Sequence, residues 1–172
     1  ETNCEAVLNP LNTYLNATLP LPERSGYYFV GWYESPTFEG SPLDRFPATG
    51  DITLYAKWTT SESIYLSFCN GASFARAIPV PVGTTSITLS EESKYFVFIP
   101  TETKSYTIRT SGASGPDSWG ALYDSSLSRL TSDDDDGSGD NFSITYELIA
   151  GQKYYICADV YDGSCNCSLI IS

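Results

Sequence analysis

The sequence predicts a mainly β protein made of two small modules. Runs of β-branched and aromatic residues recur along the chain, each bounded by Gly, Pro, Asn or Asp, which is the pattern of strands and turns. Helix signals are confined to residues 11–19, where Asn12, Thr13 and Asn16 weaken them. With 41% hydrophobic residues over 172 positions, the chain has enough apolar side chains to fold, and its length suits two small domains.

The first module contains two clear strand signals. Residues 52–58 alternate between apolar and polar, and residues 27–33 are a β-branched and aromatic run that follows a turn-prone segment. Between them, residues 34–50 are rich in Pro, Gly and Ser and do not continue a strand. We expect Trp32 and Trp58 to build the core, because so short a domain needs large apolar side chains.

A polar stretch at residues 60–67 predicts a linker, so that the first module spans residues 1–59 and the second residues 68–172. Turn signals about ten residues apart divide the second module into short strands, and this spacing without helices predicts an antiparallel β-sandwich or jelly roll. The expected strands are residues 86–89, 95–99, 105–110, 119–123, 142–148, 154–160 and 167–171.

Five cysteines raise the question of disulfides. If residues 154–160 and 165–171 form a hairpin, Cys157 lies opposite Cys167 at a distance that suits a disulfide. A zinc site is the alternative, although the chain has no His and no Cys-x-x-Cys pair. Because the total is odd, at least one thiol is free or pairs outside the chain.

The charge of the chain excludes two classes of partner. There are 21 acidic and 9 basic side chains, for a net charge of −12, so a phosphate backbone or an anionic membrane surface is repelled. No apolar run approaches the roughly 20 residues of a membrane-spanning helix. We therefore predict no nucleic-acid binding and no membrane insertion, and we expect a monomer. Because Met is absent altogether, we also expect the chain to be a fragment of a longer protein.

The first module carries two characteristic signatures. Residues 18–33 read Thr-Leu-Pro-Leu-Pro-Glu-Arg-Ser-Gly-Tyr-Tyr-Phe-Val-Gly-Trp-Tyr, and residues 53–58 read Thr-Leu-Tyr-Ala-Lys-Trp. Over residues 4–58 the chain resembles the internalin B-type repeat, also described as the Listeria–Bacteroides repeat. The resemblance implies a small β-grasp-like fold that occurs in tandem on bacterial surface and secreted proteins. Asn9-Pro10 stands where that family usually has an Asn-Gly-Gly-like turn.

The second module has several pieces that resemble a different family. They are Ser73-Phe74-Ala75-Arg76-Ala77-Ile78-Pro79, Tyr95-Phe96-Val97-Phe98, Tyr106-Thr107-Ile108, Leu122-Tyr123-Asp124, the Asp133–Asp136 run, and Ala150-Gly151-Gln152-Lys153-Tyr154-Tyr155-Ile156. Together they make residues 68–172 similar to the bacterial pre-peptidase C-terminal domain. That resemblance implies a jelly-roll-like sandwich appended to exported proteins, some of which bind calcium or polymeric substrates. Ser93-Lys94-Tyr95 departs from the family, which frequently has Asp in place of this Tyr.

No catalytic residue is predicted. Without His, the Ser-His-Asp and Cys-His arrangements are impossible within the chain. Its carboxylates lie mostly in polar turns, where solvent keeps them ionised, whereas a glycosidase pair needs one acid with a raised pKa in a pocket. We therefore expect a protein that is not an enzyme.

The acidic, Gly-rich run at residues 133–141 is the sharpest chemical signal. Calcium takes about six to eight oxygen ligands, which such a loop can supply, so the run predicts a structural calcium ion. The candidate ligands are Asp133, Asp134, Asp135, Asp136 and Asp140. In the alternative interpretation, the run is a solvated turn whose Asp side chains cap local backbone amides. The sequence leaves both open.

Trp119, Tyr123 and Tyr161 are the candidate ligand-binding residues. On a strand through residues 119–123, Trp119 and Tyr123 share one side, and they face outward if Leu122 points into the core. An exposed indole beside a Tyr is a surface on which sugar rings stack. Tyr161, in the turn at residues 160–163, is a further exposed aromatic with the same two interpretations. The alternative places Trp119 and Tyr123 in the core.

These features predict a non-catalytic part of a modular bacterial cell-surface or secreted protein. The first module is expected to act as a spacer, and the second to bind an extracellular glycan or a host surface protein. In the alternative, both modules are purely architectural, or they are accessory domains that hold an exported hydrolase on its substrate.

Overall fold

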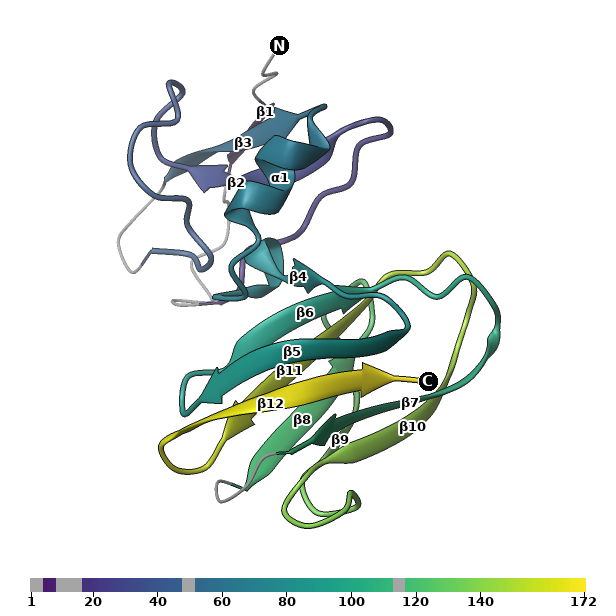
Figure 1. The fold of residues 1–172 in the computed structure, drawn as a ribbon. Coiled ribbons are helices and arrows are strands. Elements are labelled where there is room, and N and C mark those ends of the chain that lie inside the picture. The colour runs from purple at the N-terminus through teal and green to yellow at the C-terminus, as the bar shows by residue number, and fades with distance from the viewer. Residues whose placement is uncertain (1–4, 9–16, 48–51, 113–116) are drawn as a thin grey trace. The chain divides into compact units, whose positions relative to one another are not determined.

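A computed structural model describes residues 5–8, 17–47, 52–112 and 117–172, with the side chains of residues 5–8 left out. The chain divides into two compact units, Glu1–Arg76 and Ala77–Ser172. Figure 1 labels their elements. The strands form three sheets, two of them wholly antiparallel, so the predicted mainly β fold is confirmed. Most of the weak helix signal at residues 11–19 lies outside the described residues.

The first unit contains a three-stranded antiparallel sheet. Its strands are β1 (Glu5–Leu8), β2 (Tyr28–Tyr33) and β3 (Thr53–Thr59), in the order β1-β3-β2. The alternation of residues 52–58 buries every second side chain of β3. Trp32 and Trp58 are 3% and 2% exposed, which confirms that they build the core of this unit.

Three aromatic rings and one glycine organise that core. The ring of Phe29 packs edge-on against Trp32 and Trp58, with ring centres 5.5 and 5.3 Å apart. The indole N–H of Trp32 donates a hydrogen bond of 2.8 Å to the Pro20 carbonyl. Gly31 lies at a bulge in β2 with φ of 149°, and a Cβ there would come within 2.6 Å of Pro42. Only glycine fits this position without displacing its neighbours.

The predicted linker at residues 60–67 is wrong, because Glu62–Phe68 form the helix α1. Ser61 caps the helix by accepting a hydrogen bond of 3.4 Å from the N–H of Ile64. The ring of Tyr65 stacks on Tyr28 of β2 with centres 4.9 Å apart. The stretch is polar in composition, yet it contains the cap and the aromatic residue that fold it onto the repeat.

The chain remains attached to the first unit beyond the helix. In the 3₁₀ helix η1 (Phe74–Arg76), Arg76 forms an ion pair with Asp44. Just before it, the Ser73 hydroxyl donates a hydrogen bond of 2.6 Å to the same carboxylate. The boundary between the units therefore falls after Arg76.

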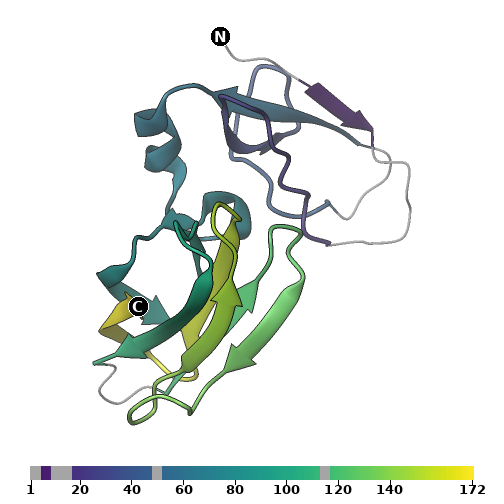
Figure 2. The same cartoon turned by 90° about the vertical axis from the view of Figure 1, so that its right-hand side faces the viewer.

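The second unit is a β-sandwich of a four-stranded and a five-stranded sheet, which lie face to face in Figure 2. The four-stranded sheet has the order β10-β7-β12-β5 and the five-stranded sheet the order β4-β6-β11-β8-β9. The strands are β4 (Ile78–Pro79), β5 (Gly83–Ser90), β6 (Lys94–Phe98), β7 (Lys104–Ser111), β8 (Ser118–Tyr123), β9 (Arg129–Asp133), β10 (Ser143–Leu148), β11 (Tyr154–Val160) and β12 (Ser164–Ile171).

The chain crosses from one sheet to the other after nearly every strand. Among the strands of this unit, only β8 and β9 are consecutive in sequence and also neighbours in a sheet. Each crossing strand turns one apolar face inward, and these faces make a single core that includes Leu89, Phe96, Ile108 and Ile156, all fully buried. The predicted sandwich is therefore confirmed, and the structure adds two strands that the sequence did not predict, β4 and β9.

The expected disulfide between Cys157 and Cys167 is not formed. Strand β11 pairs with β6 and β8, whereas β12 pairs with β5 and β7, so the two cysteines belong to different sheets. Cys69, Cys157, Cys165 and Cys167 are all free thiols, and Cys4 lies outside the described residues. The prediction is wrong because it took the short turn after β11 for a hairpin, although the turn carries the chain across the sandwich.

Replacing Gly31 by Ala is expected to destabilise the first unit by about 2–3 kcal/mol, because the new Cβ overlaps Pro42 at a positive φ. Chemical unfolding followed by tryptophan fluorescence measures this, since Trp32 and Trp58 both belong to the unit. Gly26→Ala is the matched control: its φ is also positive, at 78°, but nothing lies within 4 Å of the new Cβ. Equal losses in the two variants would contradict the role of Pro42.

Candidate functional site

The outer surface of the five-stranded sheet carries a group of aromatic side chains. Leu122 of β8 is fully buried in the core, so Trp119, Ala121 and Tyr123 point to the opposite side of the strand. Trp119 and Tyr123 are both partly exposed, as the outward-facing interpretation of this strand requires.

The neighbouring strands continue this surface. On β11, Tyr155 lies opposite Tyr123 and Asp159 lies opposite Trp119, while Tyr95 of β6 lies across from Cys157. We call this surface the aromatic face and define it by Tyr95, Trp119, Tyr123, Tyr155 and Asp159; Tyr155 is buried, and the other four are partly exposed. Sequence reasoning missed its members on β6 and β11. The alternation along β11, with Ile156 and Ala158 in the core, identifies them by the rule already used for β8.

Close packing under β8 fixes this orientation. A Cβ on Gly120 would lie 2.6 Å from ring atoms of Phe142, so the ring of Phe142 occupies the place of the missing side chain. The hydroxyl of Ser118 is buried, lies 2.7 Å from that of Thr110 and accepts a hydrogen bond of 3.2 Å from the N–H of Phe142. These contacts hold both ends of the segment that carries Trp119.

Tyr161 lies near the Trp119 end of the face. Its side chain is 63% exposed, and its N–H donates a hydrogen bond of 3.0 Å to the carbonyl of Asp117. Loss of hydration, followed by the negative charges of Asp134, Asp117, Asp159 and Asp135, raises the pKa of the Tyr161 hydroxyl. The end of the face that contains Tyr161 is therefore strongly negative.

Two carboxylates close to Trp119 share this environment. Burial raises the pKa of Asp159, while a hydrogen bond of 2.7 Å from the Ser93 hydroxyl acts in the opposite direction. Loss of hydration and the charges of Asp135, Asp140 and Asp134 raise the pKa of Asp117. In the described part of the chain, Asp117 Oδ1 has no hydrogen-bond partner and is shielded from solvent. The Asp159 carboxylate is thus an acceptor beside the partly exposed indole of Trp119.

The acidic loop is held by hydrogen bonds within the chain. Asp133 is the last residue of β9, and its Oδ2 accepts from the N–H of Ser143 at 2.7 Å and of Asp136 at 3.2 Å. The side-chain amide of Asn141 donates a hydrogen bond of 2.8 Å to the Ser138 carbonyl. Among the described residues, no three carboxylates or thiols converge to hold a metal ion. The calcium and zinc interpretations of the sequence therefore stay predictions, and a calcium ion would need the loop to bring more of its carboxylates together.

The buried thiols are poor nucleophiles. Burial raises the pKa of Cys157, against the effect of hydrogen bonds from Ser93 and Tyr95. Burial and the neighbouring Cys165 raise the pKa of Cys167 to about 12. Both thiols stay protonated near neutral pH, and the thiolate is the reactive form.

Comparison with known proteins connects the first unit to a family. Residues 10–57 match the family of the Listeria-Bacteroides repeat domain, which confirms the resemblance of the first module. The bacterial repeat, together with the β-rich fold, indicates that this chain is part of an exported, modular protein. No curated protein matches the sequence. Within the described residues, no helix is long and apolar enough to cross a membrane.

Two solved structures are similar to part of the chain. One is the pre-peptidase C-terminal domain of a collagenase from Bacillus anthracis, with 18% identity and a TM-score of 0.47, covering 56% of this chain and 94% of that one. The other is PliG of Aeromonas hydrophila, a periplasmic inhibitor of g-type lysozyme, with 14% identity and a TM-score of 0.41, covering 56% and 94%. The first of these structures belongs to the family that the sequence of residues 68–172 also resembles.

Replacing Asp133 by Asn is expected to destabilise the second unit by about 1–3 kcal/mol, because a neutral amide oxygen accepts more weakly from the two backbone N–H groups. Thermal unfolding followed by circular dichroism measures the loss. Asp135→Asn is the control, since Asp135 is exposed and its removal relieves repulsion with Asp117. A loss in Asp135→Asn as large as in Asp133→Asn would contradict the capping role.

Calcium titration tests the loop directly. Because the described carboxylates do not converge, we expect millimolar calcium to leave the melting temperature of the metal-free protein unchanged. A rise in the melting temperature that Asp134→Asn and Asp136→Asn abolish would instead show that the loop rearranges around an ion.

Proposed function

We propose that residues 77–172 form a non-catalytic module that binds an extracellular glycan through the aromatic face, and that the first unit is a spacer in the same exported protein. The single observation that carries this proposal is the outward orientation of Trp119 beside Asp159. It is supported by the core position of Leu122 and by the pairing of Trp119 with Asp159 across β8 and β11.

The chemistry of the face suits a sugar ring. The apolar side of a pyranose packs on an aromatic ring, and the hydroxyl groups at its edge need hydrogen-bond acceptors. Trp119, Tyr123 and Tyr161 supply rings that are at least partly exposed. Asp159 supplies carboxylate oxygens next to Trp119, and Asp117 lies two residues before Trp119 in the chain. These are the two kinds of contact that a glycan site combines.

The proposal also accounts for the negative charge at this end of the face. A protein of net charge −12 favours neutral or positively charged ligands over anionic ones. Most sugar units of structural polysaccharides are neutral. A host protein would need a larger apolar surface than these few rings provide, because stable protein interfaces bury about 800 Å² per partner.

Binding is tested on a printed glycan array and by pull-down on cellulose, chitin and bacterial peptidoglycan. We expect wild type to bind at least one of these, and Trp119→Ala to weaken that binding roughly tenfold or more, since loss of a stacking ring costs about 1.4 kcal/mol or more. Trp119→Phe is expected to retain part of the affinity.

Val82→Ala is the control, because Val82 is 52% exposed and lies outside the aromatic face. If wild type bound none of these glycans, the proposal would fail and the architectural alternative would be favoured. Binding unaffected by Trp119→Ala would move the site away from the aromatic face.

A further inference from the structure

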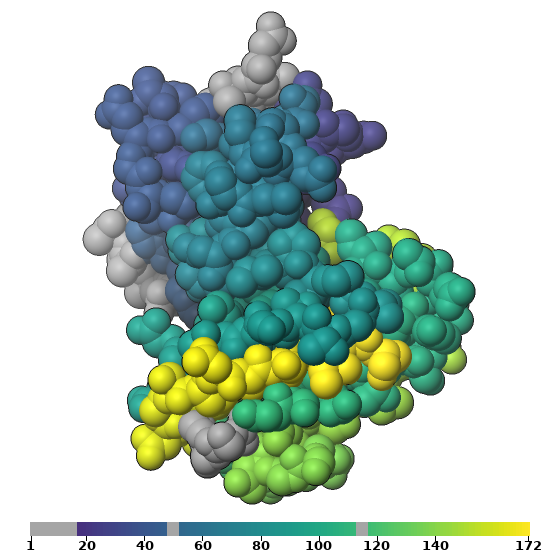
Figure 3. Space-filling model, in the orientation of Figure 1, coloured from purple at the N-terminus to yellow at the C-terminus, as the bar shows by residue number. Residues whose placement is uncertain are grey.

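Strand β5 is an edge of the four-stranded sheet. It pairs along its whole length, Gly83–Ser90, with β12, and no strand of the described residues lies on its other side. In Figure 3, the yellow strand β12 crosses the exposed surface of this sheet. Natural edge strands are commonly protected by charged residues, proline or bulges, since unpaired backbone groups attract other strands. Gly83–Ser90 itself contains no charged residue and no proline, and its register with β12 is unbroken, so the protection of this edge comes from the Lys94 side chain beside Thr88.

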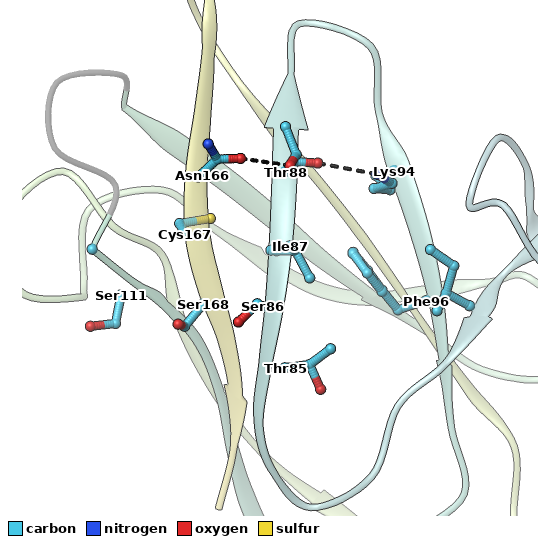
Figure 4. Close-up of a pocket in the computed structure, with 12 residues that line it drawn as sticks. Thr85, Ser86, Ile87, Thr88, Lys94, Phe96, Ser111, Asn166, Cys167 and Ser168 are labelled. Carbon is cyan, nitrogen blue, oxygen red and sulfur yellow. Dashed lines mark hydrogen bonds between the residues drawn. The ribbon is translucent and has the colours of Figure 1, made fainter.

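The unpaired side of β5 can be assigned residue by residue. The Lys94 ammonium donates a hydrogen bond of 3.2 Å to the Thr88 carbonyl, so the backbone groups of Thr88 point away from β12 (Figure 4). In an antiparallel strand every second residue points the same way, so Thr84 and Ser86 also face outward. Among the described residues, no group outside the sheet ladder accepts their backbone N–H groups.

The space beside this edge is open. A groove of about 610 Å³ follows β5, and its lining includes apolar residues such as Phe96 as well as a row of short side chains, Ser111, Ser168 and Ser86, across three strands. Lys94 is the charged residue among those that line it. Figure 4 shows Lys94 lying across the edge from Thr88. The groove therefore leaves room for an added strand once the Lys94 ammonium leaves the Thr88 carbonyl.

We propose that β5 pairs antiparallel with β5 of a second copy of this chain, with Ser86 on the two-fold axis. This pairing places Ser86 opposite Ser86 of the second copy, and Thr84 opposite Thr88 of the second copy. Hydroxyl pairs across antiparallel strands are favourable, and no like charges meet at the contact, although each copy carries a net charge of −12. The assembly is a symmetric dimer, in place of the monomer expected from the sequence.

A second copy fits this edge better than a strand from another protein. Lys94 is the one charged residue that lines the groove, so little else there would distinguish one foreign strand from another. By contrast, the backbone and hydroxyl pattern of β5 is complementary to itself. An acidic foreign strand is the competing occupant, and the experiment below separates the two.

The test is the mass of the full chain in solution, measured by sedimentation velocity and light scattering from about 1 µM to about 1 mM. We expect the mass of wild type to rise from the monomer value of 18.8 kDa toward twice that value with concentration. Ser86→Pro is expected to remain a monomer and to keep the wild-type melting temperature, because the N–H of Ser86 is not used within one copy.

A charge pair tests the two-fold axis itself. Ser86→Lys and Ser86→Asp are each expected to be monomeric, because like charges would face one another, and an equimolar mixture of the two is expected to dimerise. Thr145→Lys, on the exposed face of the opposite edge strand β10, is the control and should dimerise like wild type. A wild type that is monomeric at every concentration overturns the proposal and leaves the edge to a foreign strand. A dimer that survives Ser86→Pro and Ser86→Lys also overturns it, because the copies then meet elsewhere.

Discussion

The packing of Phe142 against Gly120 is the contact on which the candidate site depends. The ring fills the space that a side chain at position 120 would need, and Leu122, two residues further along β8, lies fully buried in the same core. Because successive side chains of a strand point to opposite faces, and positions 120 and 122 face inward, Trp119, Ala121 and Tyr123 face outward. A larger residue at position 120 would move β8 away from Phe142 and disturb the pairing that brings Asp159 beside Trp119.

The crossing topology explains why the two outer surfaces of the sandwich differ. Since successive strands belong to different sheets, each surface is assembled from strands that are far apart in sequence. The five-stranded sheet collects Tyr95, Trp119, Tyr123 and Tyr155 on its outer side. The four-stranded sheet collects short polar side chains instead, with Thr107 against Thr145 and Thr88 against Asn166. One surface suits ring stacking, whereas the other presents short polar groups.

Local pattern predicted most of the fold. Alternation and turn residues located most strands of both units, though not β4 and β9, and the burial of Trp32 and Trp58 followed from the size of the first module. The prediction of a linker failed because Tyr65 stacks on Tyr28. These residues are 37 positions apart in the sequence, and composition does not reveal such a contact. The disulfide failed because a turn of a few residues leads either to a hairpin or across a sandwich, and only the packed core decides between them.

The candidate site was predictable only in part, for the same reason. Trp119 and Tyr123 share one strand, so a single assumption about Leu122 placed them together. Asp159 comes to Trp119 through strand pairing, which depends on the order of strands in the sheet. The acidic run shows a further limit: two backbone N–H groups donate to Asp133 Oδ2, and these bonds depend on how the loop folds, which its composition does not reveal.

The two proposals combine into one mode of action. A two-fold axis that relates antiparallel strands within a sheet runs perpendicular to that sheet, so it leaves the corresponding faces of both copies pointing the same way. The aromatic face lies on the far side of the sandwich from the exposed side of the four-stranded sheet. In the dimer both aromatic faces would therefore be presented in one direction, which allows a single long polysaccharide to engage both. Because the second contact is then intramolecular, weak binding at each Trp119 becomes strong binding of the pair, without any new contact. A module with small, shallow sites gains most from this arrangement, since its affinity for one sugar chain is limited by the few rings that touch it.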